Sequence, residues 1–287
     1  MTPVEAILLA IAAFVAGAVN GVAGGGSLLS FPALLAFGHL DAKPANVTNT
    51  VALWPGYVGG ALGYRALLAP QRGTMTALTV SSVLGALTGA AILLLTSAAA
   101  FRAIVPYLVL FGALVLAFQS KLGALITRFR RPWVPGEPVP VEAHPVIFLL
   151  GVYGAYFGAG LGTMTLAALS ILLPDDLQRS NALKSMLSLV INAVAVAVFV
   201  FSGFVAWLPA VVMAVAALAG GYIGVGFARR LSARMLKAFV VGYSLAVAVR
   251  LFALPWPLAI GVGLASAAAM YLLTAPARPS TAPAPVR

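Results

Sequence analysis

The chain has 287 residues, of which 62% are hydrophobic and only 8% are charged. Soluble globular domains have about 25% charged residues, so the composition excludes a soluble protein and indicates a membrane protein with several spans. The formal net charge of +11 comes from basic residues in short connections between apolar runs. This distribution indicates that the basic residues orient the protein in the membrane and do not bind nucleic acid. The sequence has no cysteine, which excludes disulfides and thiolate chemistry.

The first half of the chain is predicted to form a broken-helix hairpin followed by three transmembrane helices. An apolar run over residues 4–22 stops at Gly24-Gly25-Gly26, because three residues without a Cβ disfavour a continuous helix. Ser27 is expected to be the N-cap of a second piece, residues 28–37, which would rise only about 15 Å and cannot cross the membrane. The predicted spanning helices then cover residues 45–64, 74–95 and 103–120.

The second half repeats this order after a loop rich in proline and arginine. An apolar run that begins at residue 145 is broken by Gly158, Gly160 and Gly162, and helices are predicted over 180–201, 208–227 and 235–251. One further apolar run has no counterpart in the first half. The predicted division is a first transmembrane repeat at 1–122, a cytoplasmic linker at 123–144, a second repeat at 145–254, an extra helix at 255–274 and a disordered tail at 275–287.

The positions of the basic clusters predict the orientation of the two hairpins. If the basic loops face the cytoplasm, as is usual in the inner membrane, an even number of crossings must separate them. Two full helices and the second broken unit lie between Arg131 and Arg229, so this broken unit must enter and leave the membrane on the same side. The first hairpin then enters from the opposite side. The predicted fold is therefore an all-α, multi-pass membrane protein built from two inverted repeats plus one helix, an arrangement common among secondary transporters.

Polar residues follow each glycine break, and the two sets stand at matching positions of the two repeats. Asn46, Asn49 and Thr50 share one helix face by their spacing, as do Asn181, Lys184 and Ser185. Backbone N–H groups at the start of a half-helix can replace the hydration of an anion. The predicted substrate-binding residues are Gly25, Gly26, Ser27, Asn46, Asn49, Thr50, Gly160, Gly162, Thr163, Asn181, Lys184 and Ser185.

Simpler explanations exist for several of these residues. Glycines in membrane helices often serve only close packing, although paired clusters followed by hydroxyl residues favour binding. Lys184 could neutralise a bound anion, or it could snorkel to the cytoplasmic surface. Asp41 and Asp176 also stand at matching positions of the repeats; stabilisation of a helix N-terminus is favoured over coupling to a proton or sodium ion. Asn20, Tyr57 and Tyr153 are weaker candidates for lining a pathway.

The same glycine breaks and polar helices resemble those of the sulfite exporter TauE/SafE family of membrane permeases. The stretches that match are NGVAGGGSLLSFP (20–32), ANVTNTVALWPG (45–56), GVYGAYFGAG (151–160) and NALK (181–184). The resemblance implies transport of small sulfur-containing anions such as sulfite, sulfoacetate or thiosulfate, coupled to an ion gradient. The second glycine cluster, Gly158-Ala159-Gly160-Leu161-Gly162, is looser than the first, so the two halves of the site could be unequal.

The leading functional hypothesis is a secondary transporter of a small anion that works by alternating access. An anion channel is the nearest alternative, since inverted half-helices also build channel filters. An intramembrane enzyme is disfavoured, because both histidines and all six acidic residues fall at helix ends or in loops. No catalytic residue, cofactor or metal site is predicted. The expected partners are the anion, a coupling proton or sodium ion and membrane lipid; a homodimer is one of the oligomeric states left open.

Overall fold

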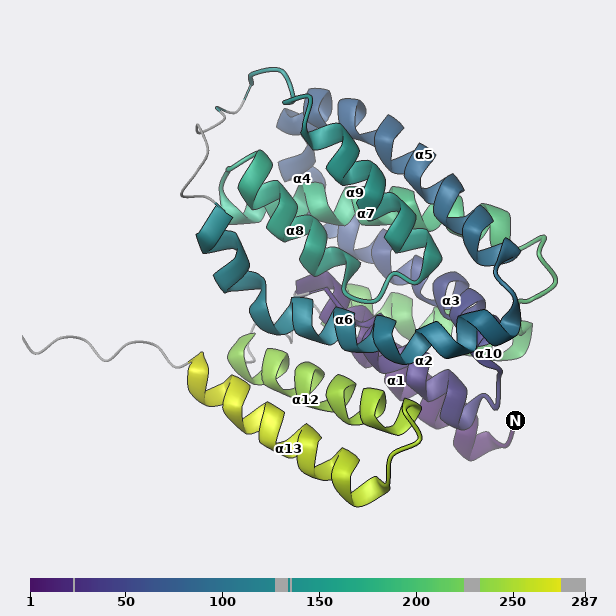
Figure 1. Ribbon diagram of the computed structural model, residues 1–287. Helices are drawn as coiled ribbons and strands as arrows, with labels where there is room; N and C mark the ends of the chain where they lie inside the picture. Colours follow the sequence, from purple (N-terminus) through teal and green to yellow (C-terminus); the bar gives the residue numbers. More distant parts are fainter. Residues whose placement is uncertain (23, 127–133, 135, 225–232, 275–287) are drawn as a thin grey trace, which may run out of the picture.

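The computed structural model describes residues 1–22, 24–126, 134, 136–224 and 233–274, and the regular structure within them is helical (Figure 1). The first half forms α1 (Pro3–Val22), α2 (Ser27–Phe37), α3 (Ala42–Gly63), α4 (Arg65–Leu68), η1 (Ala69–Gln71), α5 (Arg72–Leu95) and α6 (Ala98–Ile126). The second half forms α7 (Ala143–Tyr156), α8 (Leu161–Leu172), α9 (Leu177–Phe199), α10 (Trp207–Ala219), the π-helical turn η3 (Gly220–Gly224), α12 (Ala233–Leu251) and α13 (Trp256–Leu273). The predicted all-α membrane fold is confirmed, whereas the opposite orientation of the two units in the bilayer stays a prediction.

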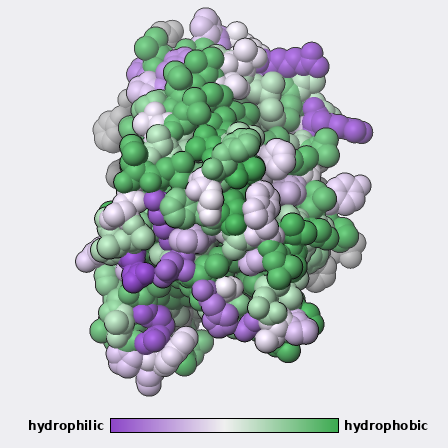
Figure 2. Space-filling view, turned by 90° about the vertical axis from the view of Figure 1, so that its right-hand side faces the viewer, coloured by the Kyte–Doolittle hydropathy of each residue, from purple (hydrophilic) through white to green (hydrophobic). Residues whose placement is uncertain are grey.

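Helix length and surface composition fit a protein embedded in lipid. Within the described residues, five segments are long and apolar enough to cross a membrane, namely Pro3–Asn20, Arg65–Leu95, Ala98–Phe118, Gln178–Phe199 and Trp256–Leu273. Hydrophobic side chains also cover much of the face in Figure 2, where a soluble protein would present charge. Helix α3 has 22 residues but falls outside this group, because its first turns contain Asn46, Thr48, Asn49 and Thr50, all of them buried inside the protein.

The two units pack against each other through glycine. Helix α1 contacts α10 and η3, and its counterpart α7 contacts α5. A Cβ added at Gly220 would lie 2.0 Å from the Phe14 carbonyl oxygen, and one added at Gly85, the matching position of the first repeat, would lie 2.2 Å from the Phe148 carbonyl oxygen. Both separations are too short for any side chain, so the helix backbones touch. Close approach through small residues is the usual basis of helix association in membranes, where burial of apolar surface gives no advantage over lipid.

Both ends of helix α6 differ from the sequence-based expectation, since the helix begins at Ala98 instead of residue 103. Helix α6 continues to Ile126 instead of ending at residue 120, so the first part of the predicted linker is helical. The basic residues predicted to orient the linker, Arg128, Arg130 and Arg131, lie outside the described residues, as do Arg229, Arg230 and the tail at 275–287.

Candidate functional site

The two glycine breaks meet each other inside the helix bundle. Gly24 and Gly25 have φ angles of 74° and 95°, and Gly158 and Gly160 have φ angles of 74° and 80°; this left-handed region favours glycine because a Cβ would clash with the backbone. A Cβ added at Gly24 would lie 2.6 Å from the Thr163 backbone nitrogen and 2.9 Å from Gly162. The backbones of the two hairpin tips are therefore in direct contact.

Three asparagines hold the broken helices in place. Asn20 Oδ1 accepts a hydrogen bond of 2.7 Å from the Gly26 N–H, and Asn49 Oδ1 accepts one of 2.6 Å from the Ser30 hydroxyl. Asn46 Nδ2 donates across to the second unit, to the carbonyl of Tyr156 at the end of α7, at 2.9 Å. These side chains satisfy polar groups that the breaks expose, which is required where no water can do so.

A small cavity lies beside the contact between the tips. Its walls are formed by Asn20, Gly24, Gly56, Tyr57, Gly60, Gly162, Lys184, Ser185 and Ser188. It offers about 10 Å³ to the centre of a water molecule, which is room for about one water. An oxyanion is larger than one water and does not fit in that space in this structure.

Lys184 supplies the charge of this cavity. Its side chain is 1% exposed, and its Nζ has no hydrogen-bond partner among the described residues. This burial rules out snorkelling to the surface. An unpaired ammonium in an apolar interior is strongly disfavoured unless a ligand compensates it.

The described acidic residues do not compensate Lys184. Glu5 contacts His39 at 2.9 Å, Asp41 contacts Arg102 at 2.7 Å, and Asp175 contacts Arg179 at 3.4 Å. The Asp176 carboxylate accepts hydrogen bonds from the backbone at the start of α9. None of these carboxylates lines the cavity, so the arrangement suits an anion that brings the missing negative charge.

The predicted site residues occupy three kinds of position. Gly162, Lys184 and Ser185 line the cavity, and Gly25, Gly26, Ser27, Gly160 and Thr163 lie in or next to the two tips. Asn46 and Asn49 form hydrogen bonds to the broken helices. The hydroxyls of Thr50 and Ser185 donate to the carbonyls of Asn46 and Asn181, one turn earlier. Gly56 and Gly60 were not predicted; they continue the helical stripe of Asn49 along α3, so extending that stripe by further turns would have found them.

The expected hydroxyl caps are absent. The N-cap of α2 is Gly26 and that of α8 is Gly160, with no side-chain cap bond at either position. Ser27 is the first residue of α2, and the Tyr57 hydroxyl faces its side chain. Because Asn20 already binds the Gly26 N–H, a hydroxyl is not needed there.

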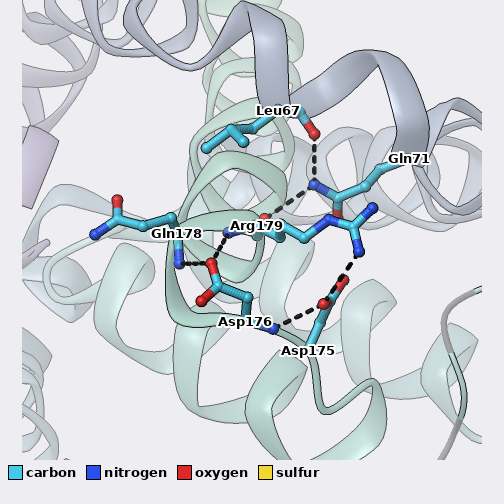
Figure 3. A network of polar contacts seen from close by, with 6 residues as sticks. All are labelled: Leu67, Gln71, Asp175, Asp176, Gln178 and Arg179. Carbon is cyan, nitrogen blue, oxygen red and sulfur yellow. Dashed lines mark hydrogen bonds and ion pairs between the residues drawn. The ribbon is translucent and has the colours of Figure 1, made fainter.

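Helix α9, which bears Lys184, is fixed at its start by a polar network (Figure 3). Asp176 Oδ1 accepts from the N–H groups of Gln178 and Arg179 at 2.8 and 3.3 Å. Gln71 Nε2 in η1 donates to the Arg179 carbonyl at 3.1 Å and to the Leu67 carbonyl at 2.8 Å. The network therefore ties the first unit to the second.

Asp176 and Asp41 should differ in their contribution to stability. We expect Asp176→Ala to lower the free energy of unfolding by about 1 kcal/mol, because it removes an N-cap. Asp41 makes no cap bond and has an exposed ion pair, so Asp41→Ala should cost about 0–1 kcal/mol. Unfolding of the purified variants in detergent measures both changes, and a larger loss for Asp41→Ala would contradict this assignment.

The helical fold, with five described segments long and apolar enough to cross a membrane, is that of a multi-pass membrane protein. The sequence model of the sulfite exporter TauE/SafE family matches residues 9–251, and the chain belongs to that family. It is a permease, not an enzyme.

The relatives that match this chain are also described as transporters. It is 28% identical over 257 residues to a probable membrane transporter protein, ORF9, of Sinorhizobium sp, which covers 89% of this chain and 95% of the relative. It is 25% identical over 251 residues to the probable membrane transporter protein YfcA of Escherichia coli K12, with 88% and 91% covered, and 25% identical over 228 residues to a probable membrane transporter protein of Haemophilus influenzae, with 79% and 87% covered. No solved structure matches the chain at a significant level.

Proposed function

We propose that this protein is a secondary transporter of small sulfur-containing or organosulfonate anions in the inner membrane, with the central cavity as its substrate site. The observation that supports this most directly is the buried Lys184 ammonium, which has no partner among the described residues and faces the cavity. The sulfur chemistry is inferred from the family, whose description names sulfite. The anion replaces the missing counter-charge of Lys184.

The half-helices add a second source of positive potential. Helices α2 and α8 have 11 and 12 residues and begin at the two tips, where the helix dipole is positive. The first backbone N–H groups of a helix have no acceptor within that helix. Such groups are the usual ligands of an oxyanion at a helix start. An anion between the tips would therefore contact groups from both units.

Transport into proteoliposomes tests this function. We expect saturable uptake of at least one radiolabelled anion from a panel of sulfite, thiosulfate and sulfonates, driven by a proton or sodium gradient. Loss of anion efflux in a deletion strain, restored by the gene, would support the same conclusion in cells. Absence of uptake of the whole panel by correctly folded protein would contradict it, and currents far above the turnover of a carrier would favour the anion channel.

Alternating access requires contacts between the units that open in turn, and two such contacts are related by the repeat. Gln71 Nε2 binds the Arg179 carbonyl in α9, and at the matching position of the second repeat the Ala206 N–H binds Thr48 Oγ1 in α3 at 3.0 Å. Each contact joins one unit to the polar helix of the other. They are the two latches that we expect to close opposite sides of the cavity.

Opening either latch should shift the cavity toward one side of the membrane. We expect Gln71→Ala and Thr48→Val each to raise about fivefold the accessibility of residue 188 to a water-soluble reagent. The two variants should expose it from opposite sides of the membrane, because each removes a hydrogen bond between the units worth about 1 kcal/mol. The chain lacks cysteine, so Ser188→Cys introduces a single thiol. Its labelling by an impermeant maleimide, in vesicles of each orientation, measures access to the cavity from each side. Thr88→Ala is the control, since the Thr88 hydroxyl binds only within its own helix. Exposure from the same side in both variants would contradict the assignment.

A further inference from the structure

The internal repeat allows the polar contacts of the two broken units to be compared. Ser30 in α2 matches Thr165 in α8, and Asn49 in α3 matches Lys184 in α9. In the first unit, the Ser30 hydroxyl donates to Asn49 Oδ1 at 2.6 Å. In the second unit, neither Thr165 Oγ1 nor Lys184 Nζ has a hydrogen-bond partner among the described residues. The contact that closes the first unit is therefore not made in the second.

Thr165 is buried as deeply as Lys184, and its hydroxyl makes no bond to the described residues. Each of the two side chains is 1% exposed. A threonine inside a helix often donates to the carbonyl one turn earlier, as Thr50 does in α3, but Thr165 Oγ1 makes no such bond. A buried hydroxyl without a protein partner costs free energy, which a bound ligand oxygen would recover.

The two asparagines one turn earlier on the polar helices do not distinguish the units. Asn46 Oδ1 and Asn181 Oδ1 stand at matching positions, and neither has a partner among the described residues. These oxygens accept hydrogen bonds, so they do not bind an anion. The Thr165 hydroxyl and the Lys184 ammonium are donors instead, and an acceptor such as an anion oxygen satisfies both.

The packing of α8 on α9 places Thr165 on the side toward which Lys184 extends. The two helices contact each other and are joined only by residues 173–176, so they run in opposite directions. Gly162 lies one turn before Thr165 on the same face of α8, and a Cβ added at Gly162 would lie 3.8 Å from Lys184 Cδ. A helical side chain leans toward the start of its own helix, which for α9 is the direction of Thr165.

We infer that Thr165 is a further substrate-binding residue, whose hydroxyl donates to one oxygen of the anion that Lys184 binds through another. This inference rests on the proposed function. Thr165 lies one turn beyond the cavity wall at Gly162, so it meets the anion when the cavity widens along α8. The ligand class is an oxyanion with two or more oxygens on one sulfur, such as sulfite, thiosulfate or a sulfonate.

Removal of the hydroxyl alone tests this role. Thr165→Val keeps the shape of the side chain, and we expect it to raise at least about tenfold the anion concentration needed for half-maximal binding, because a hydrogen bond to a charged group is lost. Thr165→Ser keeps the hydroxyl and should bind like the wild type. Sulfite, thiosulfate and methanesulfonate are each titrated into the purified protein, with thermal stabilisation as the readout. Thr88→Val is the control, since the Thr88 hydroxyl binds only within its own helix.

The stability of the substrate-free variants gives a second readout, which separates binding from folding. Thr165→Val should unfold at the wild-type temperature or above it, because the lost hydroxyl has no partner among the described residues. Ser30→Ala, at the matching position, should unfold at a lower temperature, because it removes the donor to Asn49 Oδ1. A loss of stability in Thr165→Val would assign its hydroxyl to folding and overturn the inference.

Binding to the wild-type protein separates failure of this inference from failure of the proposed function. If the wild type binds an anion of the panel and Thr165→Val binds it equally well, Thr165 is not part of the site and the transporter function stands. If Thr165→Ser loses binding as Thr165→Val does, the hydroxyl is not the group required, and the inference fails in the same way. If no anion of the panel binds to the folded wild type or is transported by it, both are overturned.

Discussion

Replacing Lys184 with alanine or glutamine is expected to reduce anion transport by about 100-fold, because loss of one partner of a buried charge pair costs about 2–5 kcal/mol of binding. The same change should leave the substrate-free protein as stable as the wild type, or more stable, since it removes a buried ammonium that has no partner among the described residues. Proteoliposome uptake and thermal unfolding of the same preparations measure the two quantities.

The opposite signs of these two effects distinguish a binding role from a structural one. A lysine kept for folding would lower stability and transport together when it is replaced. Arg102→Gln serves as the control, because Arg102 is an exposed partner of Asp41 and its ion pair contributes little. Normal transport by both Lys184→Ala and Lys184→Gln would reject the pairing of Lys184 with the anion.

Gly24→Ala is expected to abolish transport by separating the hairpin tips. The new Cβ would lie 2.6 Å from the Thr163 nitrogen, against backbone that has no side-chain freedom with which to move away. The left-handed φ of 74° adds about 1–2 kcal/mol of strain for a residue with a Cβ. Uptake per folded molecule, with the folded fraction measured by size-exclusion chromatography, gives the result.

Gly203 provides a control for the strain alone. Its φ is 75°, but a Cβ added there would have no atom within 4 Å. Gly203→Ala should therefore lose a similar amount of stability, because alanine is strained at a left-handed φ, but it should transport like the wild type. If Gly24→Ala transported as well as Gly203→Ala, close contact between the tips would not be needed for function.

The helical order of the fold could be read from the sequence because its signals are local. Apolar runs determine the spans, and Gly24 to Gly26 and Gly158 to Gly162 determine the breaks, since glycine weakens a helix wherever it lies. The polar stripe of α9 likewise follows from helical spacing, which predicted that Lys184 and Ser185 share a face. The end of α6 was misplaced because Lys121 and the residues after it suggested a loop, whereas the helix continues to Ile126.

The hydrogen-bond partners of Asn46 and Asn49 could not be predicted in this way. Their helical spacing places both on one face of α3, and their substrate role stays a prediction, but the spacing does not show that they bind the broken helices. Their partners, Ser30 and Tyr156, lie 19 and 110 residues away along the chain. Only the packing of the hairpins decides whether a polar side chain meets the protein or the cavity.

The repeat places Asn49 of α3 at the position that Lys184 occupies in α9, and this difference between the halves has an electrical consequence. A substrate-free carrier with one positive charge in its cavity feels the membrane potential, which is worth about 2.3 kcal/mol per 100 mV for a charge that crosses the whole field. In the carrier proposed above, the negative interior of the cell would therefore draw the empty cavity toward the cytoplasmic side. A bound anion would compensate the charge of Lys184 and reduce this electrical bias.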